Sequence, residues 1–172
     1  MTTPMVARRV AGRAIVVSML FVSAGLLRAE PAEPLLMNPF GDPFIAATQG
    51  APCATPLGPA YTDRERRAET HSRAERGTSC WLSGRCKEPN AYRYDAANAA
   101  AAVIALRRDA SIATSSIWVT AQRRLIYLEG CAVDAAQADR ATSAVAALPD
   151  VDRVIPALAL PGERAPYRRA QP

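Results

Sequence analysis

The stretch "SSIWVTAQRRLIYLEGC", residues 115–131, contains two runs with the alternation of side chains that is typical of β-strands. Successive side chains of a strand point to opposite faces, so a period of two indicates a strand with one buried face. A short polar segment centred on Gln122-Arg123 separates the runs and predicts a tight turn. The stretch is therefore expected to form a β-hairpin.

This predicted hairpin has two different faces. With the turn at Gln122-Arg123, one face carries only aliphatic side chains, those of Ile117, Val119, Ile126 and Leu128. The other face carries Trp118, Leu125 and Tyr127, with Cys131 on the same side. The aliphatic face is expected to meet helices. The aromatic face either binds a partner or is covered by the N-terminal part of the chain, and covering is favoured because large apolar patches are seldom left exposed.

Helices are predicted on both sides of the hairpin. "DAANAAAAVIALRRDA" (95–110) begins on Asp95 as N-cap, and its apolar residues recur at helical spacing at Ala99, Val103, Leu106 and Ala110. "DAAQADRATSAVAAL" (134–148) begins on Asp134, with Gln137 placed to close a capping box and a face formed by Ala138, Ala141, Val145 and Leu148.

A last strand, "VDRVIPALAL" (151–160), follows the second helix, and Pro156 within it indicates an edge strand or a bulge. The order helix, strand, strand, helix, strand predicts the α+β class. We expect a small αββαβ sandwich over residues 95–160, with two helices on one face of a three-stranded sheet.

The segments outside this unit have a different texture. Residues 30–94 are expected to be an irregular, disulfide-stapled N-terminal extension, because residues 30–60 are proline-rich and aperiodic. Residues 61–77 predict a solvated helix, with a capping box of Thr62 and Glu65, a stop at Gly77 and no apolar stripe. Residues 161–172 are expected to form a flexible tail.

The first 29 residues have the pattern of a secretory signal peptide. Three arginines precede the apolar run "AIVVSMLFVSAGLL" (14–27), and small residues then allow cleavage after Gly25 or Ala29. The run is short for a membrane span, and an uncleaved anchor is the alternative. We therefore expect the protein to be periplasmic or secreted after cleavage.

The net charge of the chain is much smaller when this predicted leader is left out. The whole chain has a formal net charge of +5, but four of its 21 basic residues lie in the leader with none of its 16 acidic ones, which leaves +1. A nearly neutral exported protein gives no support to a nucleic-acid partner.

The four cysteines all follow the leader, and in an oxidising compartment an even number predicts disulfides. Three pairings are possible. The favoured one joins Cys80 to Cys86 in a short local loop and Cys53 to Cys131 between the extension and the folded unit.

Two chemical roles compete with this interpretation at Cys80. The context "SCW" (79–81) is similar to that of a papain-type nucleophile, but such an enzyme needs a histidine far downstream, and the only histidine, His71, lies upstream. A zinc site of His71, Cys80, Cys86 and Cys131 would require reduced thiols, which export disfavours. Cys80 is therefore predicted to be half of a disulfide, and no metal site is expected.

Motifs for catalysis are missing from the sequence. It contains no Gly-x-Ser-x-Gly, no phosphate loop and no paired-histidine motif, and its acidic residues are scattered. The sequence predicts neither an enzyme nor a cofactor nor a small-molecule substrate.

Residues 95–160, about two-fifths of the chain, resemble a BON domain (bacterial OsmY and nodulation domain). The resemblance rests on "AAVIALRRD" as the opening helix, "IWVTAQRRLIYLEG" as the hairpin and "ATSAVAALPDVDRVIPAL" as the second helix and last strand. The family usually has a glycine in the hairpin turn, where this chain has Gln122-Arg123-Arg124, and a polar residue in place of Pro156.

The resemblance implies an exported cell-envelope module that binds anionic phospholipid surfaces or membrane-associated partners. The alternative is a structural or chaperone-like factor that docks another envelope protein. The candidate lipid contacts are Arg107, Arg108, Arg123 and Arg124, while Trp118 and Tyr127 are the candidates for protein docking. Residues 95–160 hold six arginines and seven acidic residues, so attraction to anionic lipid must be local.

Overall fold

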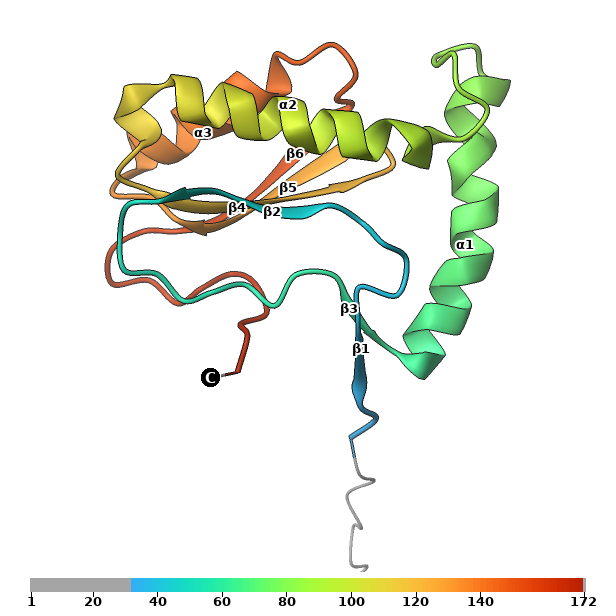
Figure 1. Ribbon diagram of the computed structural model, residues 1–172, viewed down its shortest axis with the longest axis horizontal. Coiled ribbons are helices and arrows are strands. Elements are labelled where there is room, and N and C mark those ends of the chain that lie inside the picture. The colour runs from blue at the N-terminus through green and yellow to red at the C-terminus, as the bar shows by residue number, and fades with distance from the viewer. Residues whose placement is uncertain (1–31, 172) are drawn as a thin grey trace, which may run out of the picture. The chain divides into compact units, whose positions relative to one another are not determined.

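The predicted hairpin lies at the centre of a four-stranded mixed sheet in the computed structural model, which describes residues 32–171 (Figure 1). Strands β4 (Ser116–Gln122) and β5 (Leu125–Cys131) are antiparallel, and β6 (Arg153–Ala159) is parallel to β5. The α+β class and the αββαβ unit are confirmed. The fourth strand, β2 (Phe44–Gln49), comes from the extension and pairs antiparallel with β4. The predicted signal segment, residues 1–29, lies outside the described residues.

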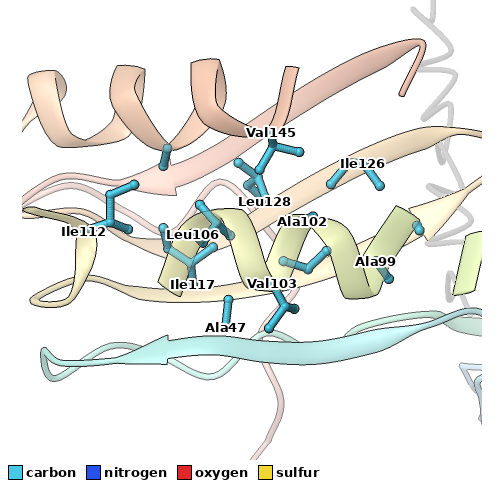
Figure 2. Packing of buried hydrophobic residues seen from close by; sticks show 13 residues of the cluster. Ala47, Ala99, Ala102, Val103, Leu106, Ile112, Ile117, Ile126, Leu128 and Val145 are labelled. Atoms are coloured by element: carbon cyan, nitrogen blue, oxygen red, sulfur yellow. The ribbon is translucent and has the colours of Figure 1, made fainter. Parts of the chain in front are cut away.

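Two helices cover one face of this sheet and enclose the core with it. Helix α2 (Asp95–Arg108) and helix α3 (Ala135–Ala146) lie side by side above the strands (Figure 1). Figure 2 shows the aliphatic side chains of the sheet meeting the helices, as the alternation predicts. The core is built from small and branched side chains: Ala47, Ala99, Ala102, Val103, Leu106, Ile112, Ile117, Val119, Ala121, Ile126, Leu128, Ala141 and Val145.

The hairpin turn lies one residue later than the sequence predicts. Gln122 pairs with Leu125, so the two turn residues are Arg123 and Arg124, with φ of 55° and 65°. This is the left-handed conformation that a two-residue hairpin turn requires, and asparagine or glycine usually supplies it. The shift moves the strand pairing by two residues, an even number, so each side chain keeps its predicted face.

The extension contains more regular structure than its composition indicates. Strands β1 (Leu35–Met37) and β3 (Ala60–Thr62) form a separate ribbon, which leads into helix α1 (Asp63–Leu82). The capping box of Thr62 and Glu65 is confirmed. Two short 3₁₀ turns, η1 (Ala91–Tyr94) and η2 (Ala110–Ile112), precede and follow α2.

The predicted stop at Gly77 is wrong, because α1 continues to Leu82. Gly77 is buried, and a Cβ atom there would lie 2.8 Å from Oδ1 of Asn90. This glycine therefore allows close approach of the Asn90 side chain and does not end the helix.

The second face of the sheet is covered by two segments of the chain itself. Residues 50–60 and the C-terminal residues run together on the side opposite the helices (Figure 1). Their backbones pair: Leu57 N–H donates to the carbonyl of Arg168, and Ala170 N–H donates to that of Thr55. The sequence predicts a flexible tail for residues 161–172, whereas these hydrogen bonds hold residues 168–170 against the extension.

Both favoured disulfides are present and confirm the predicted pairing. Cys53 is bonded to Cys131, and Cys80 to Cys86. The first bond fastens the covering segment to β5, and the second closes a loop at the end of α1. Two disulfides indicate an oxidising compartment. Among residues 32–171, no helix combines the length and apolar character needed to cross a membrane.

The two disulfides should differ in their contribution to stability. The chain-entropy relation gives about 4–5 kcal/mol for the Cys53–Cys131 bond, which spans 78 residues, and about 2 kcal/mol for the Cys80–Cys86 bond, which spans 6. We expect urea unfolding of the paired alanine variants to show this order. A larger loss for Cys80→Ala with Cys86→Ala would contradict it.

The covered face also predicts a pH dependence. Burial raises the pKa of Glu129 above its ordinary value of 4.5, so the folded protein holds this proton more tightly than the unfolded chain does. The free energy of unfolding then falls as the pH rises through that pKa. We expect Glu129→Gln to raise the melting temperature at pH 7 by a few degrees, and the gain to disappear below about pH 4. An equal gain at both pH values would show that burial of the charge is not the cause.

Candidate functional site

The hairpin turn is held by a carboxylate at the start of α2. Asp95 accepts a hydrogen bond from the backbone N–H of Arg123 at 2.8 Å and another from that of Arg124 at 3.0 Å, one on each oxygen. The sequence predicts Asp95 as the N-cap of α2, and this is wrong: the N-cap is Tyr94, which makes no side-chain cap. The carboxylate instead supplies the acceptors for both N–H groups of the turn.

This arrangement stabilises a turn that its own residues disfavour. A left-handed conformation costs an arginine about 1–2 kcal/mol, and the turn contains two of them. Hydrogen bonds to a charged acceptor contribute about 1.5–3 kcal/mol each and offset that strain. Burial raises the pKa of the Asp95 carboxyl, while the two N–H donors act to lower it. The turn is therefore fixed in place.

One arginine of the turn points into the protein. Arg124 is 7% exposed, and its guanidinium donates to the carbonyl of Asp150 at 2.9 Å, pairs with Asp152 at 3.3 Å and lies over the ring of Tyr94. A further hydrogen bond reaches the carbonyl of Arg85. Arg124 therefore joins the turn to the loop before β6. It also joins the turn to the loop that the Cys80–Cys86 disulfide closes, called the cystine loop below.

The two arginines at the end of α2 also have different surroundings. The guanidinium of Arg107 donates to the carbonyls of Ala47 at 2.9 Å and Ala46 at 3.0 Å, on the edge strand β2. Filling the free acceptors of an edge strand protects the sheet against pairing with another chain. Arg108 is exposed, and no partner for it is present among residues 32–171.

Trp118 and Tyr127 lie on the second face, as the alternation predicts, and both are half-buried. The covering segment of residues 50–60 reaches the area around Tyr127, where Gly58 and Ala60 line the same pocket. The covering segment therefore leaves these two aromatic side chains partly exposed and partly covered.

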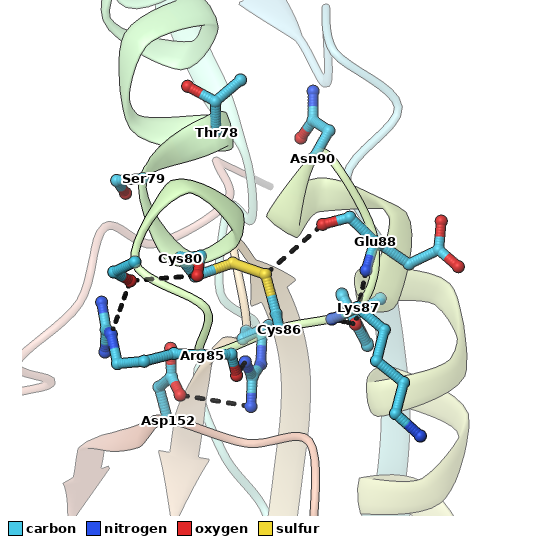
Figure 3. The surroundings of a disulfide bond; sticks show 12 residues. Thr78, Ser79, Cys80, Arg85, Cys86, Lys87, Glu88, Asn90 and Asp152 are labelled. Carbon is cyan, nitrogen blue, oxygen red and sulfur yellow. Dashed lines mark hydrogen bonds and ion pairs between the residues drawn. A yellow bond between two sulfur atoms is a disulfide. The ribbon is translucent and has the colours of Figure 1, made fainter.

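A cavity of about 400 Å³ lies between the end of α1, the hairpin turn and the start of β6. Its lining includes three arginines from separate segments: Arg85 of the cystine loop, Arg123 of the turn and Arg153 of β6. Asp152 is the one carboxylate in the lining, and it is already paired with Arg124. Figure 3 shows Arg85 and Asp152 beside the Cys80–Cys86 disulfide. The cavity is therefore cationic.

Helix α1 forms one wall of this cavity through Ser79 and Cys80. The helix has no apolar stripe, and it is held by Arg73, whose guanidinium binds both oxygens of the buried Asp42, at 2.6 and 3.1 Å. The guanidinium also lies over the rings of Phe40 and Tyr92. Breaking a buried ion pair is strongly unfavourable, so the pair fixes α1 against the rest of the protein.

The cavity has the chemistry of an anion site. Guanidinium groups bind phosphate and carboxylate oxygens through paired N–H donors. Of the arginines in the cavity, sequence reasoning identified Arg123 and missed Arg85 and Arg153, because only the folded chain brings them together. Within residues 32–171, no cluster of three histidine, cysteine or acidic residues is placed to hold a metal ion.

Removal of the Asp95 carboxylate should therefore destabilise the protein. We expect Asp95→Ala to cost about 2–4 kcal/mol, because two N–H groups in a strained turn lose their acceptor. Urea unfolding measures the loss. Asp109→Ala is the control, since its carboxylate accepts hydrogen bonds only from Ser111 in the short turn η2, and it should cost less than about 2 kcal/mol. Equal losses for both variants would refute the special role of Asp95.

Comparison with known protein families matches residues 95–162 to the BON domain. No curated protein and no solved structure matches the chain. The BON domain is a non-catalytic binding module that is commonly associated with membrane or phospholipid binding. The matched range covers α2, the hairpin, α3 and β6, the unit built around the Asp95-bound turn. The chain therefore carries a single BON domain, at residues 95–162.

Proposed function

We propose that the protein is an exported cell-envelope module that binds the phosphate groups of anionic phospholipids. The observation that carries this proposal is the cavity in which Arg85, Arg123 and Arg153 converge from three segments. A volume of about 400 Å³ is large enough for a lipid headgroup. The association of BON domains with phospholipid binding supports the same ligand class.

The charges around the cavity favour an anion over a neutral ligand. Within the described residues, no carboxylate pairs with the guanidinium of Arg123 or Arg153. Each basic side chain near an anionic membrane surface contributes about 1 kcal/mol, and the attraction is screened beyond a Debye length. Binding should therefore be local to this end of the protein and should weaken as salt increases.

Export of the protein is the second part of the proposal. The basic, apolar and small residues of the first 29 positions have the order of a secretory signal, and the two disulfides suit an oxidising compartment. The periplasm or the cell exterior is then the place of action, where the lipid surfaces of envelope membranes are accessible.

A different candidate function is docking of another envelope protein. The observation that favours it is β1, which exposes Leu35, Leu36 and Met37 on a ribbon outside the main sheet. An exposed apolar strand can pair with a strand of a partner. Substitutions in β1 would weaken such docking, whereas substitutions of the arginines in the cavity would leave it unchanged.

Arginine variants test the lipid proposal. We expect Arg123→Asn and Arg153→Gln each to weaken co-flotation with vesicles of phosphatidylglycerol and phosphatidylcholine about fivefold at low salt. Arg64→Gln is the matched control, because Arg64 is exposed at the other end of α1 and the cavity is lined by the C-terminal end. Equal effects of all three variants would show that binding depends only on the net charge of the protein and would refute the site.

Arg123→Asn should also separate binding from stability. Asparagine tolerates the left-handed conformation better than arginine does, so the variant should be up to about 1 kcal/mol more stable while it binds vesicles less well. Urea unfolding and flotation of the same preparation measure both effects. A variant that loses stability and binding together would contradict a functional reason for Arg123.

A further inference from the structure

The C-terminal end of α1 exposes two large apolar side chains. Trp81 is 48% exposed and Leu82 is 73% exposed. They are the only large apolar residues of this 20-residue helix, whose remaining residues are polar, charged, small or cysteine. Neither side chain supports the core of the protein. Together they form an exposed apolar surface that a partner with apolar groups can bind.

The cystine loop holds this end of the helix in a defined conformation. Cys80 is buried and bonded to Cys86, and the N–H of Arg85 donates to the carbonyl of Cys80 at 2.8 Å. The N–H of Gly84 donates to the carbonyl of Trp81 at 2.9 Å, and Gly84 has a φ of 70°, which closes the turn. The two apolar side chains are therefore presented on a rigid tip, defined here as residues 81–87.

The tip is continuous with the cationic cavity. Ser79 and Cys80, directly before Trp81, line the cavity, and so does Arg85 of the tip itself. Lys87 adds a second exposed cation within the tip. Apolar side chains beside cationic ones complement one kind of surface in particular, a bilayer with anionic headgroups above its acyl chains.

We propose that Trp81 and Leu82 insert into the interfacial region of an anionic bilayer while the arginines of the cavity hold headgroup phosphates. An indole ring suits this position, because it is apolar over most of its surface and carries one N–H donor. The proposal rests on the proposed phospholipid binding and adds to it a contact outside residues 95–162, in the extension. The extension is then part of the binding surface as well as a cover for the sheet.

Tryptophan fluorescence tests this insertion directly. The chain has two tryptophans, so the Trp118→Phe variant reports on Trp81 alone. We expect its emission to shift to the blue with phosphatidylglycerol vesicles and to be quenched by phospholipids brominated near the headgroup end of their acyl chains. The paired variant Trp81→Ser with Leu82→Ser should bind these vesicles at least tenfold more weakly, with both disulfides intact.

Ile104→Ser is the matched control for the paired variant, because Ile104 is 49% exposed and lies on α2, outside the lining of the cavity. It should leave vesicle binding unchanged. Vesicle binding that depends on Arg123 and Arg153 but leaves Trp81 unquenched would overturn the insertion and leave the proposed function standing. An absence of vesicle binding in the wild-type protein would overturn both.

Discussion

The bond between the Asp95 carboxylate and the two N–H groups of the hairpin turn is the constraint on which the rest of the structure depends. It joins the first residue of α2 to the link between the two central strands, and so sets how the helix lies on the sheet. It also sustains a turn of two arginines in a conformation that glycine or asparagine would adopt with less strain. The consequence is a division of roles: Arg124 is buried in a network of carbonyl groups, while Arg123 lines the cavity.

Local pattern was sufficient to predict the elements of the BON unit and the faces of its strands. The spacing of apolar residues indicates a helix or strand only when that element buries one side, and each element of the BON unit does so. The sequence did not indicate β2, because "FIAATQ" (44–49) follows a proline-rich segment and becomes a strand only by pairing with β4. The role of Asp95 was missed for a similar reason. A helix N-cap is a local pattern, whereas the actual hydrogen-bond partners of the Asp95 carboxylate lie 28 and 29 residues away in the sequence.

The candidate site shows the same limit. A basic pair at a helix end and another in a turn were visible in the sequence, but the fold uses one arginine of each pair internally. Arg85 reaches the cavity because α1 is anchored by the Asp42–Arg73 pair and by the disulfide at its end, whereas Arg153 is placed by the pairing of β6 with β5. That Cys80 forms a disulfide could be predicted, since its alternative roles needed a downstream histidine or reduced thiols. Its pairing with Cys86 was favoured among three possibilities because it closes a short local loop. The meeting of three arginines could not be predicted, because no sequence spacing encodes it.

The central claim is that the arginines of one cavity meet anionic lipid. Its most direct test is an NMR titration of the oxidised protein with phosphatidylglycerol nanodiscs, observed at the arginine side-chain Nε–H signals. We expect the signals of Arg85, Arg123 and Arg153 to shift or broaden together, while those of Arg73 and Arg107, whose guanidinium groups are held within the protein, stay in place. Shifts spread evenly over the exposed arginines, or confined to arginines outside the cavity, would contradict the claim.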